Sequence, residues 1–311
     1  MLTRAPTTVV RDWHSDSRHW DRYEPREGDI VIGTAAKVGT TWTSQIVNLL
    51  VFQSPEPRTI GLVSPWLDAR IFAPLDMMLA DLGAQTHRRF IKTHLRMDAV
   101  PIYDEVKYIH TARDGRDAAM SYMNHLNSHT KGAWARFDEI GAADPTLGGP
   151  MPRAPGTPRE FFHYWLDAPG EHTAGGFIEL ERSYWAQCKA PNVLLVHYND
   201  LKADLDGEMR RISSFLDIPI NEDIWPSLVE AATFYAMKRD GDVVLAGYEF
   251  GFEGGHRSFL HKATNGRWQG VVDNDDLARW REKLESALSP KLIAWLEGGR
   301  AVAGDPRDAI D

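Results

Sequence analysis

Asp29-Ile-Val-Ile-Gly-Thr34-Ala-Ala-Lys37-Val-Gly39-Thr40-Thr41-Trp42 is the stretch of sequence that decides the fold. Residues 29–34 form a short, β-branched apolar run, which is typical of a buried strand. A glycine-containing turn follows at residues 37–39. From Thr40 to Phe52 apolar residues recur at helical spacing, and Thr40 is placed to cap the helix. The stretch therefore predicts a strand, a loop and a helix in succession.

The same alternation of strand and helix continues along the chain. Further strands are expected at residues 89–93, 106–111 and 192–197, and helices at 115–126, 201–216, 275–284 and 290–296. This order favours an α/β fold with a mainly parallel central sheet flanked by helices and wound by right-handed crossovers. Ligands of such sheets bind at the carboxyl ends of the strands, so the turn at residues 37–39 is the first place to look for a site.

The length of 311 residues and the 43% apolar content predict one large domain over residues 1–311, with residues 1–28 as an N-terminal extension. Two stretches do not fit the alternation. Residues 131–158 are rich in Gly and Pro, and residues 240–270 repeat Gly among aromatic residues. We expect both to be long loops that cover the active site.

Composition excludes several classes of function. A net charge of −9 disfavours broad attachment to nucleic acid or to anionic lipid, because such binding needs a basic face. The single cysteine, Cys188, allows no intrachain disulfide. No apolar signal region is expected in residues 1–20, and no run reaches the ~20 apolar residues of a membrane span. We expect a cytoplasmic protein without a membrane span.

The turn at residues 37–39 predicts an anion site. A strand, a glycine turn and a helix N-terminus bring backbone N–H groups together, and Lys37 adds a cation. In the ATP-binding P-loop the lysine follows the last glycine, whereas here Lys37 precedes Gly39 and the pair Thr40-Thr41 follows it. The chain also has no apolar strand that ends in an Asp suited to magnesium. A P-loop kinase of small molecules therefore stays only as an alternative.

Lys37-Val38-Gly39-Thr40-Thr41-Trp42 closely resembles the phosphosulfate loop of cytosolic-type sulfotransferases, usually written Pro-Lys-Ser-Gly-Thr-Thr-Trp. Ala36 and Val38 depart from that pattern at positions where backbone donors can act. The resemblance runs from about residue 29 to residue 280. It implies that the chain moves a sulfuryl group from 3′-phosphoadenosine 5′-phosphosulfate (PAPS) to a small acceptor, with 3′-phosphoadenosine 5′-phosphate (PAP) as the product and with no metal.

A second signature supports the resemblance. Residues 108–122 are similar to the family's strand-to-helix segment, in which an Arg and a Ser eight residues later hold the 3′-phosphate of the nucleotide. The corresponding residues are Arg113 and Ser121. The guanidinium of Arg113 offers a planar fork of donors to an oxyanion, which a lysine cannot match.

A catalytic base is expected between the two signatures. Lys92-Thr-His94 resembles the family's strand that ends in Lys-Thr-His. The unperturbed pKa of a histidine, near 6.5, allows the neutral imidazole to accept a proton at working pH. His94 is therefore predicted to be the general base, and Lys37 and Lys92 to act on the sulfonate and the departing oxygen. Most of the 12 histidines are expected to be bystanders.

The resemblance implies further contacts with the nucleotide. Trp42 is expected to stack on adenine, Tyr198 to meet the base or its phosphate, and Thr233 to supply one contact. His261-Lys262-Ala263 resembles the C-terminal Arg-Lys-Gly loop that closes over the 3′-phosphate. His261 replaces the Arg and Ala263 the Gly, which weakens the cationic fork and the loop's freedom at positive φ.

The acceptor is not fixed by any residue. The aromatic and apolar candidates for its pocket suit a phenol, a sterol or a lipid alcohol, and they are Trp66, Phe72, Met77, Met78, Tyr122, Trp134, Phe137, Tyr248 and Phe252. The family's dimer segment has no clean counterpart after Trp268, so a homodimer is left open. A second alternative is a nucleotide-binding protein without catalysis, which the changes at His261 and Ala263 would allow.

Overall fold

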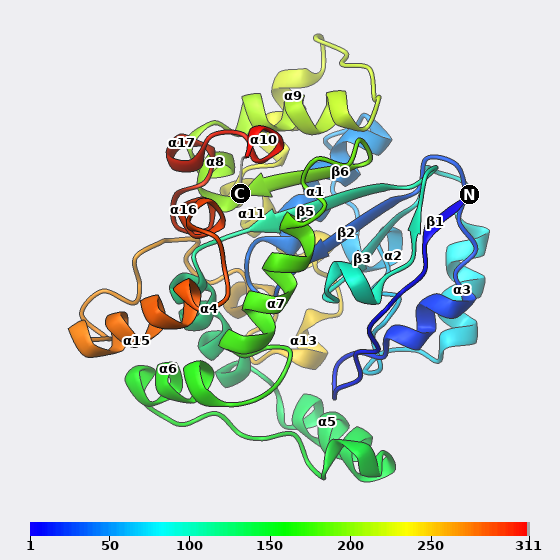
Figure 1. Ribbon diagram of the computed structural model, residues 1–311. Coiled ribbons are helices and arrows are strands. Elements are labelled where there is room, and N and C mark those ends of the chain that lie inside the picture. Colours follow the sequence, from blue (N-terminus) through cyan, green and yellow to red (C-terminus); the bar gives the residue numbers. More distant parts are fainter. Residues whose placement is uncertain (310–311) are drawn as a thin grey trace.

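The computed structural model describes residues 1–309. Its centre is a four-stranded parallel sheet in the order β3-β2-β5-β6. The strands are β2 (Ile30–Thr34), β3 (Phe90–Thr93), β5 (Lys107–Ala112) and β6 (Val193–His197). Helices cover both faces of this sheet (Figure 1). The α/β fold with a mainly parallel sheet is thereby confirmed.

The strands are buried on both faces, as their continuous apolar sequences require. In β2 the side chain of Val31 belongs to the core on one face, while Ile30 and Ile32 belong to the core on the other. The register pairs Ile32 with Lys92 of β3 and with Ile109 of β5. All four strands therefore run side by side and end at the same edge of the sheet.

Each face has its own set of helices. The face of Ile30 and Ile32 packs against α1 (Thr40–Phe52), α9 (Leu205–Phe215) and α10 (Trp225–Ala231). The opposite face packs against α4 (Gly115–Asn127), α6 (Pro158–Asp167), α7 (Ala174–Trp185), α15 (Asn274–Glu285) and α16 (Pro290–Gly298). In Figure 1 α9 lies above the sheet, while α4, α6 and α7 lie below it.

The predicted helix at residues 201–216 is interrupted in the structure. It divides into α8 (Tyr198–Ala203) and α9, with Asp204 between them at φ −148°. The side chain of Asp204 accepts a hydrogen bond from the backbone N–H of Gly207, which caps a new helix. The break follows from this local cap, because it competes with continuation of the first helix.

The expectation of two long loops is wrong in part. Residues 131–143 form helix α5 (Lys131–Ala143), which Thr130 caps by accepting from the N–H of Ala133. Only residues 144–157 remain irregular, apart from the short η3 (Pro145–Leu147). Three short helices also break up the second stretch: α12 (Gly241–Val244), α13 (Tyr248–Gly251) and α14 (His256–Phe259). Apolar residues at helical spacing, such as Phe137 and Ile140, are the signal that the glycine and proline content obscured.

The N-terminal extension is built into the domain. Strand β1 (Leu2–Arg4) pairs antiparallel with β4 (Ile102–Tyr103). Near the end of the extension, the hydroxyl of Tyr23 donates to the Oδ2 of Asp29 at 2.6 Å. Asp29, which directly precedes β2, also forms a buried ion pair with Arg89, which directly precedes β3. These contacts fix the extension against the start of the sheet.

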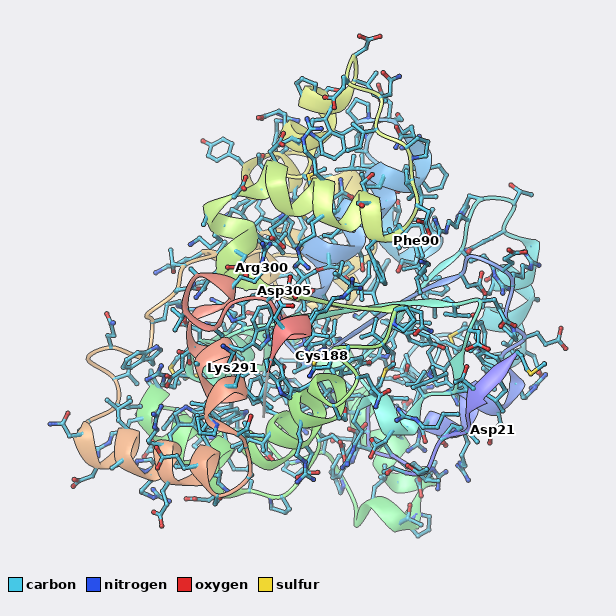
Figure 2. All side chains as sticks on the ribbon, turned by 45° about the horizontal axis from the view of Figure 1, so that its top comes forward. Asp21, Phe90, Cys188, Lys291, Arg300 and Asp305 are labelled. Carbon is cyan, nitrogen blue, oxygen red and sulfur yellow. The ribbon has the colours of Figure 1, made fainter. Side chains whose placement is uncertain are left out.

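The remaining elements contain ten residues or fewer. They are η1 (Ser17–Arg22), α2 (Ile60–Val63), α3 (Leu75–Ala84), η2 (Met97–Ala99), α11 (Phe234–Arg239), α17 (Arg300–Ala303) and η4 (Pro306–Asp308). Figure 2 shows Asp21 at the periphery, whereas Phe90 and Cys188 lie within the molecule. Within residues 1–309, no helix combines the length and the apolar character needed to cross a bilayer.

Candidate active site

A cavity of about 560 Å³ opens at the carboxyl edge of the sheet. Residues that follow each of the four strands line it, namely Ala36, His94, Arg113 and Tyr198. Its cover comes from α5, from the segment at residues 247–252 and from α14. The cavity therefore lies where parallel α/β sheets place their ligands.

The turn between β2 and α1 has the strained backbone of an anion-binding loop. Lys37 adopts φ 68° and Gly39 φ 123°. The positive φ of Gly39 favours glycine, and an added Cβ atom would also make a tight contact of 3.2 Å with a ring carbon of Tyr198. The side chain of Val38 is fully buried, so only its backbone can act on a ligand.

The N-terminus of α1 is left without a side-chain cap. Gly39 is the N-cap residue, and the prediction that Thr40 caps the helix is wrong. The hydroxyl of Thr40 lies 2.5 Å from that of Thr34, and the hydroxyl of Thr43 lies 2.6 Å from that of Thr111. These pairs fasten α1 to the sheet. The first N–H groups of the helix remain available to an anion.

Two lysines face the cavity beside this turn. The Nζ of Lys37 lies 4.1 Å from the ring centroid of Phe259, and the Nζ of Lys92 lies 4.4 Å from that of Trp66. Burial, together with the charges of Lys92 and Arg113, lowers the pKa of Lys37 to about 7. Burial lowers the pKa of Lys92 to about 8. The cations repel one another in a desolvated space, which an anionic ligand would relieve.

His94 presents one ring nitrogen to the cavity. Its Nδ1 lies 2.8 Å from the backbone oxygen of Thr34. Because a carbonyl oxygen only accepts, Nδ1 carries the proton, and the Nε2 of the neutral ring holds a lone pair. Burial and the charge of Lys92 lower the pKa of His94 well below 6.5. A neutral imidazole in this tautomer can take a proton from a hydroxyl group in the cavity.

Arg113 and Ser121 line the cavity on the side of α4. The Nη2 of Arg113 donates to the oxygen of Thr264 at 3.0 Å and to the Oδ1 of Asn265 at 2.8 Å. Its guanidinium carbon lies 4.2 Å from the ring centroid of Tyr198. Within residues 1–309 its buried Nε has no hydrogen-bond partner. The side chain of Arg113 is thus held in place, and its Nε–H group remains available as a donor to a ligand.

The C-terminal loop reaches the same side of the cavity. His261, Lys262 and Ala263 all line it, and Ala263 adopts φ 51°, where the family pattern has glycine. Asp117 of α4 anchors the loop, since its carboxylate accepts from the N–H of Gly266 at 3.1 Å and from that of Arg267 at 3.2 Å. The departure at Ala263 therefore leaves the backbone in the left-handed region, at some cost in strain.

The other residues expected to meet the nucleotide divide into two groups. Trp42 and Tyr198 line the cavity, with their rings edge to face at 5.4 Å, and the Nε1 of Trp42 donates to the oxygen of Ala232 at 2.7 Å. Thr233 is not among the lining residues. Its hydroxyl donates to the oxygen of Glu230 at 2.8 Å and accepts from the N–H of Ala236, which caps α11. The hydroxyl of Thr233 is therefore used in capping α11.

The rest of the cavity is lined by aromatic rings and by several histidines. Of the apolar candidates, six line it: Trp66, Phe72, Tyr122, Phe137, Tyr248 and Phe252. Met77 is 57% exposed on α3, and Met78 and Trp134 are also outside the lining.

Six of the 12 histidines line this cavity, whereas the sequence singled out only His94 and His261. The six are His14, His94, His125, His129, His172 and His261. Four of them, His14, His125, His129 and His172, were missed. His125 and His129 stand four residues apart on α4 and just beyond it, which is the one spacing signal available.

Comparison with known proteins agrees with this geometry. The sulfotransferase domain family matches residues 27–291. A glycolipid sulfotransferase of Mycobacterium bovis is 33% identical over 310 residues, which cover 94% of each chain. Cytosolic sulfotransferase 1 of Danio rerio is 26% identical over 292 residues, covering 87% of this chain and 88% of that one.

Solved structures share the fold. Retinol dehydratase in complex with androsterone and the inactive cofactor PAP superposes with a TM-score of 0.67 at 22% identity, covering 88% of this chain and 84% of that one. A mouse sulfotransferase complexed with PAP gives a TM-score of 0.64 at 17% identity, covering 87% of each chain. The family match spans most of the described domain, including the turn at residues 37–39, His94 and Arg113. The chain belongs to the sulfotransferase family.

Proposed function

We propose that this protein transfers a sulfuryl group from PAPS to a hydroxyl or amine group of a small, largely apolar acceptor. The observation that carries the proposal is the convergence of Lys37, Lys92 and His94 on one cavity with Arg113 and Ser121. One cavity thus holds cationic and N–H donors together with a neutral base. A donor with an anionic group at each end and an acceptor with a transferable proton need such a set.

The donor side supports a nucleotide with two anionic groups. The uncapped N-terminus of α1 and Lys37 suit the 5′-phosphosulfate, and Arg113, Ser121 and Lys262 suit the 3′-phosphate. The unpartnered, buried Nε of Arg113, within the described residues 1–309, is the kind of donor that a phosphate would satisfy. Trp42 and Tyr198 offer aromatic faces to the base.

The acceptor side supports base catalysis by His94. As the acceptor oxygen forms its bond to sulfur, the bond from sulfur to the bridging phosphate oxygen breaks, and the acceptor proton passes to the Nε2 of His94. Lys37 and Lys92 stabilise the negative charge that develops on the sulfonate and the departing oxygen. The lowered pKa of His94 keeps its ring in the accepting form at neutral pH. The chain's own residues supply each of these roles.

The aromatic walls of the cavity favour an acceptor with an apolar body. Ring surface comes from Trp66, Phe72, Tyr122 and Phe137. The histidines of the lining offer polar contacts to the part of the acceptor that surrounds its reacting hydroxyl. Lipid alcohols, sterols and phenols all fit this description. The relatives named glycolipid sulfotransferases make a glycolipid the first acceptor to test.

The single cysteine of the chain suits a reducing compartment, and we place the reaction in the cytoplasm.

Two measurements test the proposal. Isothermal titration with PAP, without magnesium, should give micromolar binding that Arg113→Ala and Ser121→Ala weaken. Incubation with radiolabelled PAPS and a panel containing a glycolipid, a sterol and a phenol should then yield a sulfated product. His94→Ala should bind PAP as the parent does and form product at least about 100-fold more slowly.

Other results would contradict the proposal in distinct ways. Binding of ATP with magnesium, and no binding of PAP, would point to the kinase alternative. Binding of PAP with no product from any acceptor would point to a nucleotide-binding protein without catalysis.

A further inference from the structure

Three potential metal ligands converge at the wall of the cavity, away from the donor-binding turn. Asp12 and His14 come from the N-terminal extension, and His172 comes from the connection between α6 and α7. One ligand atom from each residue lies within 4.8 Å of those from the other two. Two histidines and one carboxylate form a donor set that first-row transition metals prefer.

One distance within this cluster equals that of a filled site, and the others are longer, up to 4.8 Å. The Oδ2 of Asp12 lies 3.4 Å from the Nε2 of His172, and its Oδ1 lies 3.9 Å from the Nδ1 of His14. Two ligand atoms at ~2.0–2.1 Å from a tetrahedral zinc ion are about 3.4 Å apart. The pair of Asp12 Oδ2 and His172 Nε2 already has this separation, and the pair of Asp12 Oδ1 and His14 Nδ1 exceeds it by about 0.5 Å, so metal binding would draw His14 closer to Asp12.

Two of these atoms lack hydrogen bonds. The Nδ1 of His14 and the Nε2 of His172 are buried, and neither has a hydrogen-bond partner within residues 1–309. The side chain of His14 is 8% exposed and that of Asp12 is 12% exposed. Buried ring nitrogens are normally satisfied by a hydrogen bond or by a metal. Here both nitrogen atoms face the carboxylate of Asp12.

The surrounding contacts hold the cluster in place. The Oδ1 of Asp12 accepts from the N–H of His14 and from that of Ser15, both at 2.7 Å, which orients the carboxylate. Arg70 fixes the same segment, because its Nη1 donates to the oxygen of Asp12 at 2.8 Å and its N–H to the oxygen of His14 at 2.7 Å.

We propose that Asp12, His14 and His172 bind a divalent first-row metal ion, with zinc the best match to the donor set. Three protein ligands leave at least one coordination position, and both histidines line the cavity. The metal joins the N-terminal extension to the connection before α7. It forms part of the wall on the side where His94 lies, since the rings of His94 and His172 have centroids 6.5 Å apart.

The test is metal binding by the untagged full chain, freed of metal by chelation and dialysis. Titration with cobalt(II), followed by its visible absorption, should show one equivalent bound with bands typical of low coordination number, and zinc should displace it. Asp12→Asn, His14→Gln and His172→Gln should each weaken binding by more than about 100-fold, because even loss of an outer partner costs 10- to 100-fold in such sites.

His163→Gln is the matched control. The Nε2 of His163 also meets a carboxylate, that of Asp276 at 2.5 Å, but it lies outside the cavity lining and outside the cluster of three. Circular dichroism would confirm that each variant is folded, and zinc should raise the melting temperature of the parent and of the control alone.

Cobalt binding that survives all three substitutions, or the absence of binding at micromolar metal, would overturn the proposal and leave Asp12 and His172 as an ion pair. Because these titrations contain neither PAPS nor acceptor, their outcome is separate from that of the sulfotransfer assays.

Discussion

The Nδ1 of His94 lies 2.8 Å from the backbone oxygen of Thr34, the last residue of β2. The strand that leads into the anion-binding turn thus also orients the ring of the proposed base. This relationship fixes the tautomer, because the oxygen of Thr34 can only accept. It also makes the base depend on the same strand that positions the proposed donor site.

Replacing His94 should separate catalysis from binding. His94→Ala is expected to lower kcat for sulfuryl transfer by about 100- to 10,000-fold, the usual contribution of a general base, while the affinity for PAP stays unchanged. Steady-state kinetics and isothermal titration measure the two quantities. A comparable loss of PAP affinity would show that His94 acts in donor binding instead.

Donor binding should take up a proton through Lys37. Its pKa of about 7 in the free protein means that roughly nine tenths of the side chain is neutral at pH 8. An anionic ligand favours the charged form, so binding raises the pKa, and affinity should fall as the pH rises above 7. Titration calorimetry with PAP in buffers of different ionisation enthalpy measures the uptake.

Lys37→Met should reduce that uptake, and any remainder would come from Lys92, whose pKa is about 8. An observed binding enthalpy that does not vary with the buffer would contradict the role assigned to Lys37.

Relieving the backbone strain at Ala263, in the loop at residues 261–264, should increase the affinity for PAP. Ala263 adopts φ 51°, which costs an alanine about 1–2 kcal/mol more than a glycine. Ala263→Gly is expected to increase PAP affinity several-fold, and Ala263→Val to reduce it, because a β-branched residue tolerates this conformation least. Equal affinities in all three proteins would mean that the loop does not contribute to nucleotide binding.

Gly33 should tolerate no side chain. A Cβ atom there would lie 1.7 Å from the hydroxyl oxygen of Tyr184, a fully buried residue of α7. Gly33→Ala is expected to lower the free energy of unfolding by about 1–3 kcal/mol, the usual cost of overpacking a core. Urea and thermal unfolding measure the effect. Gly61→Ala is the control, since its added Cβ would meet nothing within 4 Å, and a similar loss in both variants would exclude the clash as the cause.

The parts of the site that could be predicted from sequence are those carried by local motifs. Strand β2, the turn and α1 lie within residues 30–52, so their order and spacing are visible in one stretch. Arg113 and Ser121 likewise share a strand-to-helix segment. The cap of α1 escaped prediction because the hydroxyl of Thr40 bonds to Thr34 instead of to its own helix.

Other features depend on contacts between distant segments. His14 and His172 meet across the N-terminal extension and the α6–α7 connection, and no spacing rule links them. Thr233 matches a motif, yet its hydroxyl caps α11, which only the local backbone geometry reveals. Hydrophobic patterning specifies strands and helices, but it does not specify which polar side chains the packed elements bring together.

Asp117 and Ser121 stand four residues apart on α4, so they share one face of that helix. The first holds the backbone of Gly266 and Arg267, and the second lines the cavity. Outward movement of the loop must break both hydrogen bonds to Asp117. In the proposed site, release of the nucleotide would then depend on two main-chain contacts made by Asp117, so the lifetime of the closed loop could be changed by substitutions at Asp117 alone.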